Sequence, residues 1–196
     1  RMWQQGARPQ QEEPFAEREP LNSKERVALA IHHREPDRIP FDLGSTQVTG
    51  IHVVAYRRLR AHLGLPVVEP RICDVVQGLA LPDDDLAGAL GIDVRGLFPL
   101  NSHNWKIDVV DAGEYWAFLD EWGMTQHQPK EDGLYFSVVK SPLDRPDVAV
   151  DDVRAHSWPD TGDPQRIEGL RALAQVYRDQ GRAVMIKGVL AGIFEM

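Results

Sequence analysis

The stretch FDLGSTQVTG, residues 41–50, brings together a carboxylate, two hydroxyls and a carboxamide, on Asp42, Ser45, Thr46 and Gln47. It follows a short apolar segment and precedes an amphipathic one. Where a strand opens onto a helix in an α/β protein, such side chains lie at the carboxyl edge of the sheet, where substrates bind. We therefore expect Asp42 to be catalytic and its three polar neighbours to bind a small substrate. The alternative is that all four side chains only form the turn.

Three further side chains are candidates for substrate binding. His52 lies in the first turn of the next predicted helix, where a neutral imidazole could exchange protons, or where it is simply a surface residue. His103, within NSHN at 101–104, follows another predicted strand and either reaches the same edge or belongs to a surface loop. Glu195 lies at a strand-to-helix turn beside Gly188 and Gly192, which allow a ligand to approach the backbone.

Two other features point to structure rather than chemistry. The acidic run at 83–85 could suggest a metal site, but consecutive residues diverge around a helix, and acids in a first turn complement the helix dipole. Cys73 is the only cysteine and is predicted to be a small core residue. A single cysteine excludes an intrachain disulfide and a zinc site of several thiolates from this chain alone.

The elements that must position these residues alternate between helix and strand. The capping-box spacing of Asn22 and Glu25 predicts a helix over 23–33, ended before Pro36, and a strand follows at 38–42. A second helix is predicted from a Thr49 N-cap to Gly64. Its predicted buried stripe consists of Ile51, Val54, Ala55, Leu59 and Leu63.

The rest of the chain continues the alternation after an interruption. A short helix is predicted at 82–91 and a strand at 92–97, followed by two or three inserted antiparallel strands over about 105–139. After a Pro-rich connection, Asp163 and Pro164 predict a helix start, and Gly181 its end. The predicted buried stripe of that helix is Ile167, Leu170, Ala174 and Tyr177. The apolar run 183–186 predicts a parallel strand buried on both faces.

Composition limits the classes of partner. The 196-residue chain carries a formal net charge of −8, so nucleic acid and anionic membranes are excluded as predicted partners. Apolar runs long enough to span a membrane are absent from the sequence. We expect a cytoplasmic protein with a polar tail at 1–21 and one domain over 22–196.

The predicted architecture is α/β, the N-terminal part of a (β/α)8 barrel with an inserted antiparallel β region. Only three parallel strands are predicted, and an open sheet of that size would leave apolar surface bare. We therefore expect the sequence to be part of a longer chain, the alternative being that a partner completes the sheet.

Four stretches carry a resemblance to a known family: SKERVALAIHHREPDRIPFDLGSTQVTGIHV at 23–54, ICDVVQGLALPDDDLAGALGIDVRGL at 72–97, SPL at 141–143 and AVMIKGVLAGIFEM at 183–196. Together they are similar to the uroporphyrinogen decarboxylase superfamily, in its branch of corrinoid-linked methyltransferase-like proteins. The resemblance implies a (β/α)8 barrel with its active site at the carboxyl ends of the strands, and a homodimer. It also implies that residues 1–196 are about the N-terminal half of the barrel, and that Asp74 matches the family's catalytic aspartate.

The sequence departs from the family pattern at two places, and each departure bears on which of the family's reactions is expected. Uroporphyrinogen decarboxylases carry an arginine-rich signature after the first strand, which binds the substrate's carboxylates, whereas FDLGSTQVTG has no arginine. The methyltransferase branch uses zinc held by a His-x-Cys pair and a distant cysteine, and this chain has no His-x-Cys. Zinc and a corrinoid partner are therefore implied by resemblance alone, with the zinc ligands outside this chain.

The expected function is transfer of a methyl group from a small methylated donor to a corrinoid protein or a thiol. One alternative is a decarboxylase-like lyase acting on a tetrapyrrole or another carboxylic acid. The other is a non-catalytic half-barrel subunit that a partner completes.

Overall fold

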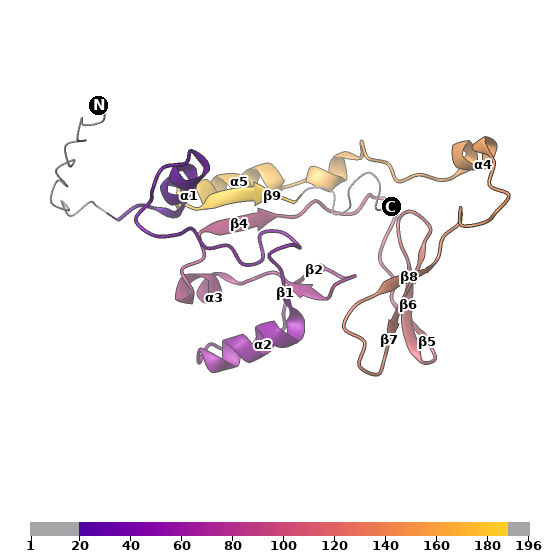
Figure 1. Ribbon diagram of the computed structural model, residues 1–196, viewed down its shortest axis with the longest axis horizontal. Helices are drawn as coiled ribbons and strands as arrows, with labels where there is room; N and C mark the ends of the chain where they lie inside the picture. Colours follow the sequence, from indigo (N-terminus) through magenta and orange to yellow (C-terminus); the bar gives the residue numbers. More distant parts are fainter. Residues whose placement is uncertain (1–19, 188–196) are drawn as a thin grey trace, which may run out of the picture.

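The computed structural model describes residues 20–187, which form a mixed α/β structure with three separate sheets and no closed barrel (Figure 1). The α-helices are α1 (Ser23–Ile31), α2 (Val53–His62), α3 (Asp84–Ala89), α4 (Val150–Ala155) and α5 (Leu170–Asp179), with a 3-10 helix at Pro164–Ile167. The strands are β1 (Ile51–His52), β2 (Ile72–Asp74), β3 (Leu79–Ala80), β4 (Val94–Leu97), β5 (Val110–Ala112), β6 (Tyr115–Leu119), β7 (Thr125–Pro129), β8 (Ser137–Lys140) and β9 (Ala183–Ile186). Within 20–187, none of these helices is long and apolar enough to cross a membrane.

The N-terminal helix follows its sequence signals. Asn22 caps α1 by accepting a hydrogen bond from the backbone N–H of Glu25 at 2.9 Å, and the Glu25 carboxylate accepts one from the backbone N–H of Asn22 at 3.0 Å. The capping box is therefore confirmed. The helix buries Ser23 and Arg26, whereas Ile31 in its last turn is 68% exposed.

The strand predicted at 38–42 is wrong, because this segment forms no regular ladder. Instead it lies beside the start of β4 through two hydrogen bonds. The backbone N–H of Asp93 donates to Phe41 O at 2.8 Å, and the backbone N–H of Phe41 donates to the Asp93 carboxylate at 2.9 Å. The Asp93 side chain thus accepts the hydrogen bond that a backbone carbonyl would accept in a β-ladder, and no further ladder pairs form between the 38–42 segment and β4.

Helix α2 differs from its prediction in start and in buried face. It is capped by His52, whose Nδ1 accepts from the backbone N–H of Val54 at 3.2 Å, and not by Thr49. The buried side chains are Tyr56 and Arg60, while Val54 is 41% exposed. The polar ends of the two buried side chains contact acids that precede and begin α3, and these contacts determine the buried face.

Strands on both sides of α2 in the chain form a small sheet that the sequence did not predict. Strands β1, β3 and β2 pair antiparallel in that order and pack near α2. Helix α3, by contrast, confirms the short helix predicted at 82–91, with its acids in the first turn. Figure 1 shows α2, α3 and this small sheet on one side of β4 and β9.

The parallel pair β4–β9 is the centre of the structure. Its register joins Val94 to Ala183 and Leu97 to Ile186, which confirms both predicted strands. Helix α5 packs on one face and buries Leu170 and Ala174 as expected, and the chain turns after it at Gly181, whose φ is +69°.

Two details of this region contradict the predictions. Ile167 is 63% exposed, because it belongs to the 3-10 helix, which Gly169 at φ +73° separates from α5. Strand β9 is not buried on both faces, since Met185 and Ile186 are 45% and 57% exposed. Within the described residues β4 is the only strand that pairs with β9, so one edge of β9 is open.

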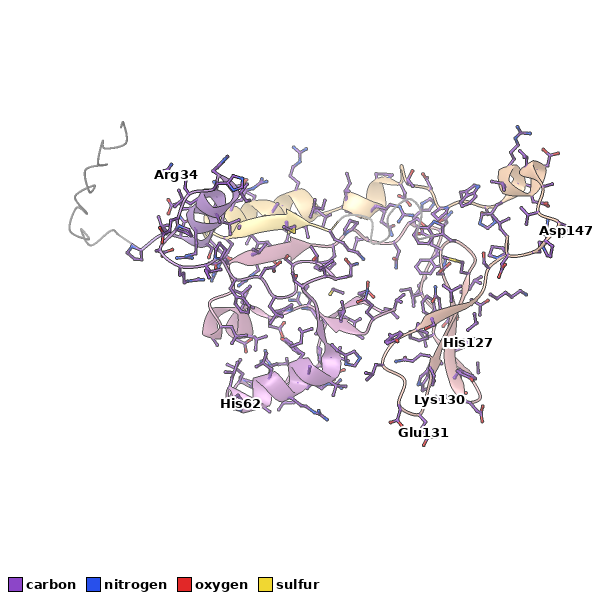
Figure 2. The ribbon with its side chains drawn as sticks, in the orientation of Figure 1. Arg34, His62, His127, Lys130, Glu131 and Asp147 are labelled. Atoms are coloured by element: carbon purple, nitrogen blue, oxygen red, sulfur yellow. The ribbon has the colours of Figure 1, made fainter. Side chains whose placement is uncertain are left out.

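The inserted region forms a four-stranded antiparallel sheet in the order β5-β6-β7-β8, where two or three strands were predicted. Phe118 and Phe136 pack edge to face in its interior, with ring centroids 4.9 Å apart. Figure 1 shows this sheet standing beside the β4–β9 pair, with α4, which was not predicted, beyond it. In Figure 2, His127 lies on β7, and Lys130 and Glu131 lie at the end of the sheet farther from β9.

A buried charge network joins α1, the 38–42 segment and β4. The Asp93 side chain is fully buried and accepts from Arg26 Nη1 at 2.6 Å and from Arg38 Nη1 at 2.8 Å. Asp37 completes the network by accepting from Arg26 Nε at 2.6 Å. Burial favours the neutral form of Asp93 and by itself would raise its pKa. The hydrogen bonds from Phe41, Arg38 and Arg26 have the larger combined effect, so the pKa of Asp93 is lowered.

Replacing Asp93→Asn is expected to destabilise the protein by about 3 kcal/mol, because the change removes the buried negative charge that faces the buried guanidinium of Arg26 and the half-exposed one of Arg38, and leaves Asp37 as the remaining carboxylate of the network. Urea unfolding at neutral pH measures the effect. Asp108→Asn, at an exposed position, is the matched control and should change the unfolding free energy by less than about 0.5 kcal/mol. Equal stability of the two variants would contradict the role of the network.

The same network predicts acid sensitivity. Hydrogen bonding to Arg26 is the main cause that lowers the pKa of Asp37 from 3.8 to about 2, and Asp93 shifts in the same direction. The unfolded chain therefore binds protons at a higher pH than the folded one, so stability should hold above pH 4 and fall between about pH 4 and pH 2. Thermal unfolding across this range tests it, and Asp93→Asn should show a shallower fall than the unmodified protein.

Candidate functional site

The two faces of the β4–β9 pair have different roles. Leu97 and Val184 pack against α5, so the residues that alternate with them, Gly96 and Met185, lie on the opposite face. Gly96 pairs directly with Met185, and the Ser45 Oγ lies 3.8 Å from the Met185 Sδ. The face away from α5, here called the inner face, is therefore covered by the loop at 42–49.

Asp42 organises this loop. Its carboxylate accepts hydrogen bonds from the backbone N–H of Ser45 at 3.2 Å, from the Ser45 hydroxyl, and from the Thr49 hydroxyl at 3.0 Å. Thr46 belongs to the same set, since its hydroxyl lies 3.4 Å from that of Thr49. The structure thus gives Asp42, Ser45 and Thr46 contacts within the turn, which is the alternative that the sequence left open.

Asp74, Gln47 and Lys187, here called the Asp74 cluster, form the second part of the site. The Asp74 carboxylate accepts from the Gln47 side-chain amide at 3.2 Å and from the backbone N–H of Gln77 at 2.8 Å. The Lys187 Nζ lies 3.8 Å from Asp74 Oδ2. Asp74 is 7% exposed, whereas the Lys187 side chain is 23% exposed. Lys187 is therefore the more accessible of these two charged groups to a ligand.

Lys187 comes directly after β9, where its backbone N–H donates to Leu97 O at 2.8 Å. By strand alternation it lies on the same inner face as Met185. Sequence reasoning predicted Gln47 and Asp74 separately but missed Lys187. The available signal was its position as the first residue after a predicted parallel strand, at the carboxyl edge.

Cys73 is unsuited to act as a nucleophile. Burial, followed by the charge of Asp74, raises the pKa of its thiol to about 11. The thiol contacts Leu79 O at 3.6 Å. A thiol that keeps its proton at neutral pH is a poor nucleophile, so the predicted structural role of Cys73 agrees with its surroundings.

His52 has both ring nitrogens engaged. Nδ1 accepts from the backbone N–H of Val54, so the proton lies on Nε2, which donates to Leu134 O at 3.1 Å. The side chain therefore joins the start of α2 to the segment before β8. Because both ring nitrogens already have backbone partners, neither is free to bond to a substrate.

His103 forms a pair with Asp163 in a different place. The Asp163 carboxylate accepts from both the backbone N–H and the Nδ1–H of His103, each at 2.7 Å. These two bonds, that of the backbone first, lower the pKa of Asp163 to about 2. The imidazole is held by a charged partner on one side, and its side chain is 67% exposed beside an open depression of about 690 Å³. This orientation leaves Nε2 directed away from Asp163.

The acids at 83–85 are engaged in contacts with α2 and β4. Asp83 accepts from the Tyr56 hydroxyl at 2.6 Å, Asp85 pairs with Arg60 at 2.7 Å, and Asp84 pairs with Arg95 at 3.5 Å. Within residues 20–187, no group of three or more His, Cys, Asp or Glu side chains is placed to hold a metal ion. Glu195, with Gly188 and Gly192, lies outside the described residues.

Comparison of the chain with protein-family models, with curated proteins and with solved structures finds no match. The site geometry and the sequence resemblance are therefore the basis of the functional proposal. Of the predicted site residues, Gln47 and Asp74 are brought together, Asp42, Ser45 and Thr46 form the adjoining loop, and His52 and His103 lie in other contacts.

Gly96→Ala is expected to destabilise the protein by about 1–3 kcal/mol, because a Cβ there would lie 2.5 Å from Ser45 O, a backbone atom of the 42–49 loop. Gly88→Ala, in α3 with open space around the added carbon, is the matched control and should be neutral or stabilise by up to about 1 kcal/mol. Denaturant unfolding of both variants measures the difference. An unaffected Gly96→Ala variant would show that the loop does not rest on β4.

Proposed function

We propose that the chain forms the N-terminal part of a (β/α)8 barrel enzyme similar to the uroporphyrinogen decarboxylase superfamily, acting in methyl transfer. Three segments support the barrel proposal, because they lie side by side in chain order: 38–42, β4 and β9. The last two are parallel, and α5 connects them across one face, as in a βα unit.

The observation that carries the functional proposal is the Lys187 ammonium beside Asp74 at the carboxyl edge of these segments. When a methyl group leaves an ether or an amine, the bonding electron pair stays on the oxygen or nitrogen of the donor. Lys187 supplies a positive charge and a proton to that atom, and the Asp74 carboxylate, 3.8 Å from the ammonium, holds the lysine side chain at this edge. Gln47 holds the Asp74 carboxylate in position.

The methyl acceptor is proposed to be a corrinoid protein or a thiol outside the described residues. Zinc, which the resemblance implies, does not fit the residues described here, because 20–187 place no group of three or more His, Cys, Asp or Glu side chains together. We derive no step through zinc from this part of the chain.

The same lysine favours a second candidate, decarboxylation of a carboxylic acid. An exposed ammonium on the inner face can pair with a substrate carboxylate, and the 42–49 loop supplies no other cation. One cation suits a substrate with one or two carboxylates better than an octa-anionic tetrapyrrole. The two candidates differ in product, since only the second releases carbon dioxide.

The test is turnover of the purified full-length protein with a panel of methylated phenols and methylamines, supplied with a corrinoid protein or a thiol as acceptor. Lys187→Met is expected to lower kcat by about 10²-fold, as removal of one charge-stabilising donor does. Lys140→Met, at an exposed position on β8, is the matched control and should retain full activity.

Demethylated product from at least one donor, lost in Lys187→Met and kept in Lys140→Met, would support methyl transfer. A second panel, of small mono- and dicarboxylic acids, tests the lyase, and carbon dioxide release from one of these acids without demethylation of the first panel would favour it. Equal activity of the two variants would contradict the assigned role of Lys187.

A further inference from the structure

Arg95 places a poorly compensated charge on the α5 face of β4, away from the Asp74 cluster. The residue is 6% exposed, and its Nε makes no hydrogen bond to the described part of the chain. The carboxylate paired with it, that of Asp84, lies 3.5 Å from Nε on a side chain that is 78% exposed. Solvent screens a pair of this kind, so Asp84 offsets little of the cost of burying the guanidinium.

A second guanidinium lies beside the first. Arg182 immediately precedes β9, and its Nη1 donates to Ile92 O at 3.3 Å. Arg95 Nη1 donates to the same oxygen at 3.4 Å. Two guanidinium groups thus share one carbonyl through long hydrogen bonds. Burial is the main cause that lowers the pKa of Arg95, and the positive charge of Arg182 lowers it further.

A small recess adjoins Arg95. It is lined by Arg95 and Tyr177 and, on the side of the 42–49 loop, by Leu43, Gly44 and Pro82, and its free space of about 10 Å³ has room for one oxygen atom or one water. An anion bound here would place a single oxygen in the recess and keep its remaining atoms outside.

We propose that Arg95 and Arg182 form a binding site for an oxyanion, a carboxylate or a phosphate, with one oxygen of the ligand seated beside Arg95. Guanidinium groups offer N–H donors in a planar fork that matches both kinds of anion. The ligand supplies the negative charge and the acceptor that the buried Arg95 lacks. The site lies near the amino ends of β4 and β9, opposite to Lys187, so it is distinct from the proposed methyl-transfer site.

The experiment is thermal unfolding of the full-length protein in increasing sodium phosphate or sodium acetate, with sodium chloride at matched ionic strength as the reference. The two arms separate a preference for phosphate from one for carboxylate. A saturable rise of about 2–4 °C over chloride is expected with the preferred anion at tenfold excess over its dissociation constant.

Two variants assign the effect. Arg182→Gln should abolish the rise, whereas Arg171→Gln, at an exposed position on α5, should retain it. Arg95→Met is a second variant, expected to unfold at a temperature that no longer depends on the anion. A rise that persists in Arg182→Gln would overturn the site, as would the absence of any rise in the unmodified protein, which would mean that water alone fills the recess.

Discussion

The buried carboxylate of Asp93 is the interaction on which the arrangement of the N-terminal half depends. One side chain accepts hydrogen bonds from two arginines and a backbone N–H, and these donors come from α1 and the 37–41 region. The segment leading to Asp42 is therefore placed against β4 by charge rather than by a β-ladder. Because the 42–49 loop begins there, the position of the loop over Gly96 follows from the same contacts.

A second polar network connects α2 to the start of α3, as the Asp93 network connects α1 to β4. Arg60 is 2% exposed and bonds to the Asp85 carboxylate and to Pro66 O, while the Tyr56 hydroxyl donates to Asp83. Apolar clusters among the described residues are small. The Asp93 network joins elements that those clusters do not, whereas the Arg60 network adds to the contact between α2 and α3 that Tyr56 and Leu86 make. Removing Asp93 or Asp85 is costly, since a buried guanidinium, that of Arg26 or of Arg60, loses a charged acceptor.

Local signals in the sequence predicted local structure well. Asn22 and Glu25 marked the start of α1, and Gly181 marked the turn after α5. Features that depend on distant partners were not predictable in this way. The burial of Arg60 depends on Asp85, and the loss of the 38–42 strand depends on Asp93. In the candidate site, Gln47 was predicted from its type and position and Asp74 from the family resemblance, but their contact and the addition of Lys187 required the tertiary fold.

The placement of the four-stranded sheet has a consequence for folding. Strands β4 and β9 are neighbours in space, yet roughly 90 residues separate them along the chain, and pairings across such distances form slowly. Strands β5 to β8 pair only with their neighbours in sequence, so this sheet can form early and by itself. Once formed, it shortens the flexible chain that must close before β9 reaches β4. Pairing of β4 with β9 can therefore be faster when the insertion has already folded than when the insertion is still unfolded.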